Sequence, residues 1–182
     1  MAKIALIIVD MQNDFCKPTG ALYIPETEDI IQPIIGLINS NEWNIVVFTQ
    51  DWHPIRHSSF KVFSPHCIQH TFGAEIISEL KFNCLPQVIF QKGYLPNVDS
   101  LSGFSDANLI STGLHTKLQS LGISIVHIVG VAIEYCVKET TLDAVKYGFD
   151  VYVHTSMIKG IDKEACENTL KLFATKGINL IP

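Results

Sequence analysis

Residues 3–10 read KIALIIVD, which is a run of six apolar residues, Ile4 to Val9, closed by an aspartate. A run that is apolar at every position is typical of a strand buried on both faces of a parallel sheet, because a strand with one wet face alternates apolar and polar residues. Six residues are too few to span a membrane or to form the apolar core of a signal peptide. The run therefore predicts an inner strand of an α/β protein, and we expect a cytoplasmic location without a membrane partner.

Further runs of the same kind recur along the chain, at Asn44–Thr49, Gln87–Phe90, Ser124–Val131, Phe149–His154 and Ile178–Ile181. Between them, apolar residues recur with helical spacing in Glu26–Asn39, Asp106–Leu121, Glu134–Tyr147 and Asp162–Lys176. Strands that alternate with helices form right-handed crossover units. We therefore expect a three-layer α/β/α sandwich around a mostly parallel, doubly wound, six-stranded sheet.

The composition limits the classes of protein that fit this chain. Its 182 residues are the length of one domain, so residues 1–182 are expected to form a single domain. Hydrophobic residues make up 47% and charged residues 17%, which excludes a disordered chain. The net charge of −5, without any long basic run, makes nucleic acid an unexpected partner. The sequence is compatible with a homo-oligomer but does not specify one.

The residues at the strand ends are candidates for a site, because ligands of parallel α/β folds bind beyond the carboxyl ends of the strands. Asp10 directly follows six buried residues, so its pKa depends on its surroundings and suits proton transfer. The alternative is that Asp10 caps a turn. Lys92 follows the third expected strand, where it is either an ordinary surface charge or a partner that keeps Asp10 ionised.

Metal-ligand residue types follow the second expected strand. Asp51 and His53 are two residues apart, and four of the seven histidines lie between positions 53 and 70. Residues two apart on an extended segment point to the same side, so this pair and a later imidazole could bind zinc, iron or manganese. The alternative is a polar surface loop in which the histidines cap turns.

The five cysteines are odd in number and include no C-x-x-C pair, which disfavours a disulfide framework or a thiolate zinc site. Cys136 alone lies at a strand-to-helix junction, where free N–H groups and the helix dipole stabilise a thiolate and could bind an oxyanion. The alternative is a small core residue. Cys84 and Cys166 are interpreted as packing residues, whereas Cys16 and Cys67 receive no role.

Over nearly its whole length, the chain resembles the nicotinamidase/pyrazinamidase members of the isochorismatase-like cysteine hydrolases. Each motif that carries the resemblance is weak alone, but the set is specific. The motifs are Asp10–Phe15, Gly20–Pro25, Asp51–Pro54, His57–Phe60, Pro65–Cys67, Lys92–Gly93, Ser102–Phe104 and Tyr135–Val137.

The resemblance implies an enzyme that hydrolyses nicotinamide to nicotinic acid and ammonia, in NAD salvage, and that also accepts pyrazinamide. It implies that Cys136 is the nucleophile, that Asp10 transfers protons and that Lys92 lies beside Asp10. The backbone amides of Ala132 and Cys136 are expected to form the oxyanion hole. The peptide bond between Val131 and Ala132 is expected to be cis.

The resemblance also implies one divalent metal ion, with zinc expected first and iron or manganese as alternatives. The expected ligands are Asp51, His53 and His66. His57 is either a further ligand or only a neighbour of the metal, since members of the family differ at this point.

The substrate pocket departs from the family pattern at two positions. Phe63 stands where Trp is frequent, and Leu101 stands where Tyr is frequent. Glu134, two residues before the nucleophile, replaces the usual Asp. We expect Phe15, Phe63, Leu101 and Tyr135 to line the pocket.

Two other functions remain compatible with the same scaffold. A metal-independent relative that acts on another small amide, or on the enol ether of isochorismate, would share the fold and Asp10 but would not need Asp51, His53 and His66 together. A non-catalytic binding domain is expected where the nucleophile or its base is lost, and both residue types are present here.

Overall fold

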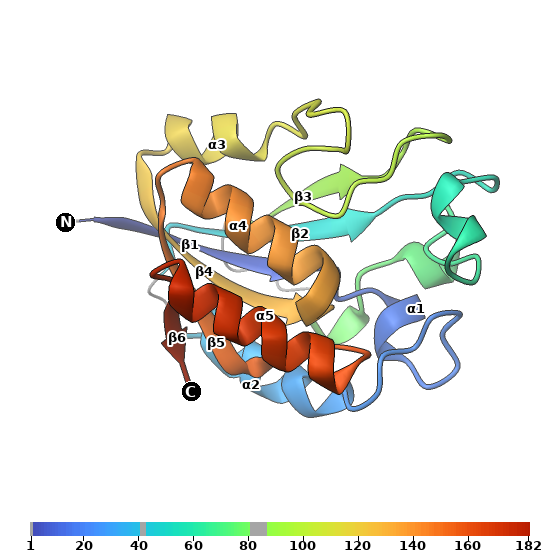
Figure 1. Cartoon of the computed structure of the whole chain (residues 1–182), viewed down its shortest axis with the longest axis horizontal. Coiled ribbons are helices and arrows are strands. Elements are labelled where there is room, and N and C mark those ends of the chain that lie inside the picture. The colour runs from blue at the N-terminus through green and yellow to red at the C-terminus, as the bar shows by residue number, and fades with distance from the viewer. Residues whose placement is uncertain (1, 41–42, 81–86) are drawn as a thin grey trace.

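The computed structural model describes residues 2–40, 43–80 and 87–182. Its centre is a six-stranded sheet in the order β3-β2-β1-β4-β5-β6, and every strand pair in it is parallel (Figure 1). The strands are β1 (Lys3–Val9), β2 (Ile45–Asp51), β3 (Gln87–Lys92), β4 (Ile123–Val131), β5 (Asp150–Lys159) and β6 (Asn179–Ile181). This order confirms the expected doubly wound sheet, whose direction of winding reverses between β1 and β4.

Helices cover both faces of the sheet. The α-helices are α1 (Asn13–Cys16), α2 (Glu28–Ile38), α3 (Leu114–Ser120), α4 (Lys138–Lys146) and α5 (Lys163–Thr175). Short 3₁₀ turns occupy Ser58–Lys61, Phe72–Ala74 and Ser78–Leu80, and a π-helical turn occupies Ile133–Val137. In Figure 1, α3, α4 and α5 lie on one face of the sheet and α2 lies on the other, so the expected three-layer sandwich is present. None of the helices in the described ranges is long and apolar enough to cross a membrane.

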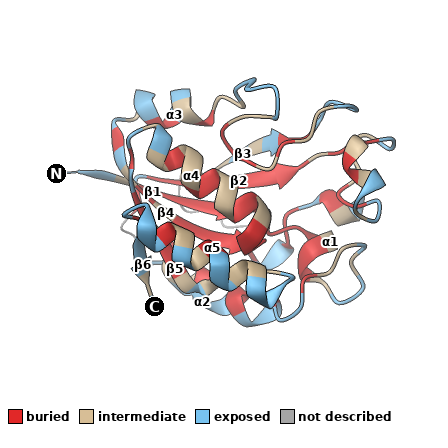
Figure 2. Ribbon diagram, viewed as in Figure 1, coloured by how far each residue is buried: buried red, intermediate tan, exposed pale blue. Residues whose placement is uncertain are grey.

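Each face of β1 contributes to a separate hydrophobic core. Ala5, Ile7 and Val9 pack on the side of α3, α4 and α5, whereas Leu6 and Ile8 pack on the side of α2. All five side chains are completely buried, as the unbroken apolar run predicts (Figure 2). The central strand is therefore held from both sides, and the residue that follows it has a fixed position.

The helix expected over Asp106–Leu121 forms only over Leu114–Ser120, so its first half was predicted wrongly. The Oδ1 atom of Asp106 accepts hydrogen bonds at 2.9 Å from two backbone N–H groups within the next four residues. A short polar side chain that captures backbone donors in this way favours a turn over a helix. Gly113, with φ of +93°, then precedes the helix.

Gly130 supplies a test of the sheet. It lies in β4 opposite Val9, its φ is +112°, and a Cβ atom built on it would overlap the backbone oxygen of Val9. We expect Gly130→Ala to lower the free energy of unfolding by about 2 kcal/mol or more, because both the backbone conformation and the contact exclude a side chain. Chemical denaturation measures the change.

The matched control is Gly36→Ala in α2, where the site is exposed and the added Cβ meets nothing within 4 Å. This substitution is expected to leave stability unchanged or to raise it by up to about 1 kcal/mol. Equal effects of the two substitutions would contradict the close approach of β4 to β1.

Candidate active site

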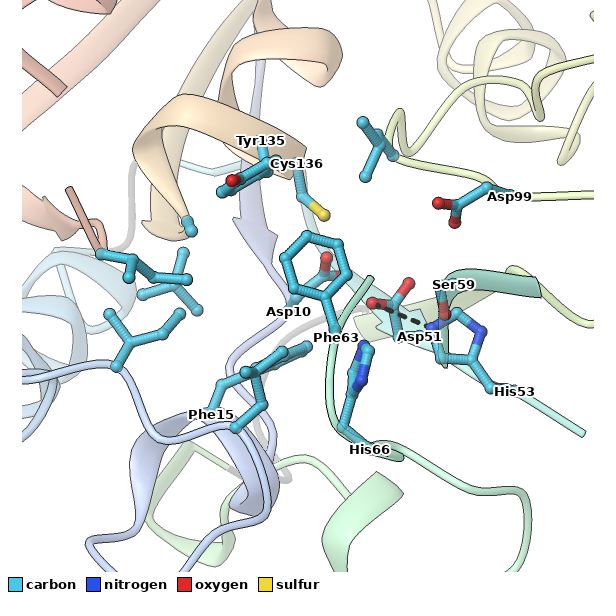
Figure 3. Close-up of a pocket in the computed structure, with 16 residues that line it drawn as sticks. Asp10, Phe15, Asp51, His53, Ser59, Phe63, His66, Asp99, Tyr135 and Cys136 are labelled. Carbon is cyan, nitrogen blue, oxygen red and sulfur yellow. Dashed lines mark ion pairs between the residues drawn. The ribbon is translucent and has the colours of Figure 1, made fainter. Parts of the chain in front are cut away.

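Four side chains from neighbouring strand ends meet at one edge of the sheet, and Figure 3 labels Asp10, Asp51 and Cys136 among them. Asp10 follows β1, Asp51 and Lys92 end β2 and β3 as register partners, and Cys136 lies in the π-helical turn after β4. The edge adjoins the reversal of strand order between β1 and β4, which is the usual place for a ligand in this type of sheet. The structure therefore brings together the residues singled out at the strand ends of the sequence.

The ammonium group of Lys92 lies at the centre of this group. Its Nζ atom is 2.5 Å from Asp51 Oδ1 and 2.8 Å from Asp10 Oδ2. It also donates hydrogen bonds to the carbonyl of Ser100 at 3.0 Å and to the sulfur of Cys136 at 3.3 Å. Burial lowers the pKa of Lys92, but the two carboxylates outweigh burial and raise that pKa well above its ordinary value. Lys92 therefore stays protonated although its side chain is fully buried.

Asp10 is held in a conformation that few residues other than glycine adopt. Its φ is +50°, a left-handed value that aspartate tolerates better than most residues. Its Oδ1 atom accepts a hydrogen bond from Thr49 Oγ1 at 2.7 Å. Burial raises the pKa of Asp10 above its ordinary value, although Lys92 opposes the shift. Asp10 is therefore a stronger base than an exposed aspartate.

Burial opposes the stabilisation of a thiolate that the strand-to-helix junction favours at Cys136. The side chain is buried, and burial raises the pKa of its thiol well above the ordinary value despite the nearby charge of Lys92. The cost of placing a negative charge in a dry pocket outweighs the nearby positive charge, so the resting group is a thiol. The sulfur and a carboxylate oxygen of Asp10 lie within 4.8 Å of each other, so Asp10 is placed to take the thiol proton.

Asp51, His53 and His66 form a buried cluster whose candidate ligand atoms all lie within 4.8 Å of one another. The Nδ1 atom of His53 is 2.9 Å from the carbonyl oxygen of Gly93, and that of His66 is 2.7 Å from the carbonyl oxygen of Ser64. A carbonyl oxygen can only accept, so both Nδ1 atoms carry the proton. In the neutral form of each ring, Nε2 then keeps a lone pair for a metal ion. Burial lowers the pKa of His53, but the charge of Asp51 outweighs burial and raises it above its ordinary value.

The charge of Asp51 completes a donor set that fits a divalent metal. Burial raises the pKa of Asp51, but Lys92 outweighs burial and the pKa is held well below its ordinary range. One ionised carboxylate with two neutral imidazoles is typical of catalytic zinc and of other transition-metal sites.

His57 lies beside the cluster, but its ring nitrogens have other partners. Its Nε2 atom donates to the carbonyl of Val98 at 3.1 Å, and its Nδ1 atom is 2.7 Å from Ser59 Oγ, from which it accepts. The ring stacks on His53 with centroids 4.0 Å apart. Of the two alternatives for His57, the geometry therefore favours a neighbour over a ligand. His70, the remaining histidine of this stretch, is exposed and lies outside the cluster.

An apolar pocket opens above these groups (Figure 3). All four residues expected in it, Phe15, Phe63, Leu101 and Tyr135, line the pocket. The rings of Phe63 and Tyr135 meet edge to face, with centroids 5.5 Å apart. The sequence reasoning missed several other lining residues: Leu22, Ile24, Ser59, Asp99, Val131 and Ile161. Leu22, Ile24 and Ser59 lie within motifs of the family resemblance, and Val131 ends β4, whereas Asp99 and Ile161 lie in loops without a recognisable pattern.

The peptide bond between Val131 and Ala132 is cis, which confirms the expectation for this position. Ala132 and Cys136 both line the pocket. Their placement is compatible with the expected use of their amides as an oxyanion hole.

Two residues of the first motif hold the site in place, and sequence reasoning gave them no role. The side-chain amide of Gln12 brackets the backbone of Asp51, donating to its carbonyl at 2.8 Å and accepting from its N–H at 2.7 Å. The Oδ2 atom of Asp14 accepts a hydrogen bond at 2.7 Å from the N–H of Cys67, the residue after His66. Their place in the motif was the available signal.

Cys16 and Cys67, which received no role from the sequence, are both buried. Cys166 is partly exposed at the start of α5, so its interpretation as a packing residue holds only in part. Cys84, which was also interpreted as a packing residue, lies outside the described residues.

Comparisons with known proteins agree with this geometry. The sequence matches the family model described as Isochorismatase domain over residues 4–181. A nicotinamidase from Acinetobacter baylyi is 37% identical over 179 residues, which cover 87% of this chain and 82% of the relative.

Two solved structures are similar along almost the whole chain. PnC1 from L. infantum in complex with nicotinate has a TM-score of 0.95 at 33% identity, and the match covers 99% of this chain and 92% of that chain. Pyrazinamidase of Pyrococcus horikoshii in complex with zinc has a TM-score of 0.88 at 38% identity, with 98% of both chains covered. The chain therefore belongs to the isochorismatase family.

Proposed function

We propose that the protein is a metal-dependent nicotinamidase, which hydrolyses nicotinamide to nicotinic acid and ammonia in NAD salvage and also accepts pyrazinamide. The observation that carries the proposal is the contact of Lys92 with both Asp10 and Cys136, beside a buried cluster of metal-ligand residues. The relatives named above, a nicotinamidase, a nicotinate complex and a zinc-bound pyrazinamidase, support the same substrate class.

In the first half of the reaction, Cys136 is the nucleophile and Asp10 is the base. Asp10 takes the thiol proton as the sulfur attacks the amide carbon, which matches a neutral resting thiol and a carboxylate of raised pKa. Lys92, 3.3 Å from the sulfur, stabilises the negative charge that develops there. Lys92 itself keeps its proton throughout.

The tetrahedral oxyanion is bound by the backbone N–H groups of Ala132 and Cys136. Asp10 then gives its proton to the departing nitrogen. Ammonia is released, and the acyl group remains bound to Cys136 as a thioester. Asp10 next removes a proton from a water molecule that attacks the thioester, and it returns this proton to the sulfur of Cys136 as the carbon–sulfur bond breaks. The products are nicotinic acid and the regenerated thiol.

Asp51, His53 and His66 are the residues that would hold the metal, and zinc is the ion we propose. A divalent ion bound there supplies a Lewis acid for the ring nitrogen of the substrate. The aromatic side chains of Phe15 and Tyr135 surround a planar ring and exclude water from the thioester.

The nucleophile is tested by Cys136→Ala. We expect ammonia release from nicotinamide to fall by at least about 10³-fold, because no other group in the pocket can form the thioester. The metal content should equal that of the wild type, since the sulfur is not among the proposed ligands. A variant that keeps the wild-type rate would overturn the nucleophile assignment.

The ligand set is tested by comparing His66→Ala with His57→Ala. His66→Ala is expected to weaken metal binding by more than about 100-fold, because it removes one of three donors. His57→Ala should retain the metal, since both nitrogens of that ring are engaged by the protein. Metal content after dialysis, measured by mass spectrometry, distinguishes the two, and loss of metal from His57→Ala would make His57 a ligand.

A further inference from the structure

Glu134 is a buried carboxylate in the same π-helical turn as Cys136, and only 6% of its surface is exposed. Within the described residues, no basic side chain forms an ion pair with it. Its Oε1 atom instead accepts two backbone hydrogen bonds, from Ile161 and from Asp162, each of 2.8 Å. A buried carboxylate satisfied in this way holds the segment that supplies the donors.

That segment is the turn between β5 and α5. A Cβ atom built on Gly160 would overlap Glu134 Oε2 and Cys166 Sγ, so the turn fits closely against the carboxylate. Asp162 then caps α5, where it accepts a hydrogen bond from the N–H of Ala165 at 2.7 Å. The carboxylate of Glu134 also lies at the positive end of this helix. One side chain therefore fastens the start of α5 to the turn that carries the nucleophile.

Ile161, whose N–H is one of the two donors, lines the substrate pocket together with Leu22 and Ile24 of a separate loop. Lys159 joins these two parts of the wall through an ion pair of 2.8 Å with Glu26. The ion pair is largely exposed on the Glu26 side, and exposed pairs contribute little. The buried hydrogen bonds of Glu134 are therefore a stronger restraint on this side of the pocket than the ion pair.

We propose that Glu134 is a positioning residue that sets the width of the substrate pocket through Ile161. By holding the 160–162 turn against the nucleophile turn, it places a branched side chain at the wall and excludes amides whose ring carries an additional substituent. The inference rests on the proposed function for its choice of substrate. Glu134 accepts hydrogen bonds from the backbone of the turn and from the thiol of Cys166 in α5, and none from the reacting groups, so the chemical step itself is expected to be unaffected.

Three substitutions distinguish the hydrogen bonds of Glu134, here called the anchor, from the pocket-lining side chain of Ile161, here called the wall. Glu134→Leu keeps the size of the side chain but leaves two backbone N–H groups without an acceptor. Glu134→Gln keeps the Oε1 acceptor and serves as the conservative control. Ile161→Ala removes the wall but leaves the anchor, and its position is 47% exposed, so the fold should tolerate it.

Steady-state kinetics of ammonia release provide the first readout. We expect Glu134→Leu and Ile161→Ala to raise KM for nicotinamide by about three- to tenfold, with kcat within about twofold, because the wall contributes uniform binding. Both should raise the relative kcat/KM for a ring-methylated nicotinamide, whereas Glu134→Gln should match the wild type. The double variant Glu134→Leu with Ile161→Ala should show no further rise in KM, since both substitutions act through the side chain of Ile161.

Hydrogen exchange of the amides at 161 and 162 provides a second readout that needs no activity. We expect exchange at least about tenfold faster in Glu134→Leu and unchanged in Glu134→Gln.

Two results would overturn the proposal. Unchanged exchange in Glu134→Leu would show that Glu134 does not hold the 160–162 turn, and a fall in kcat at constant KM would show that it does not act through Ile161. If Glu134→Leu does not fold, unchanged KM and selectivity in Ile161→Ala overturn the proposal. A wild type that does not hydrolyse nicotinamide refutes the proposed function, while the exchange data still decide for or against the anchor.

Discussion

The buried ammonium of Lys92 is the interaction on which the site depends. Asp10 and Asp51 lie within 4.8 Å of each other in a dry environment, where two carboxylates cannot both stay ionised without a compensating cation. Lys92 contacts both of them, so its charge opposes the rise in the pKa of Asp10 that burial causes and holds the pKa of Asp51 well below its ordinary range. With both carboxylates ionised, the group carries a net negative charge, which favours a divalent cation beside it.

The parallel sheet makes this group possible. Because β1, β2, β3 and β4 are parallel and all end at the same edge, residues far apart in the sequence meet there. The close approach of β4 to β1 at Gly130 brings the nucleophile turn next to Asp10. Gln12 and Asp14 then fix the loops around that edge by hydrogen bonds to backbone atoms. The strands thus fix the positions of the charged residues, and Gln12 and Asp14 of the first motif hold the neighbouring loops next to these residues.

The fold and the charged part of the site could be predicted because an unbroken apolar run defines a strand and the residue at its end, as with Asp10. The degree to which burial raises the pKa of Cys136 could not be predicted, because desolvation depends on neighbours that the local sequence does not reveal. The hydrogen bond between Glu134 and Ile161 could not be predicted either. The apolar run of the sequence ends at His154, but β5 continues to Lys159, so the sequence did not show where the following turn lies. The resemblance to a family supplied the ligand set and the pocket residues, which spacing alone left open.

The pocket and the reacting groups stand on different parts of the scaffold. Leu22, Phe63 and Ile161 come from three separate loops, whereas the charged groups stand at strand ends. Loops accept insertion and substitution more readily than buried strands do. A lineage built on this scaffold can therefore change the shape of the amides that it accepts while it inherits the same bond-breaking chemistry.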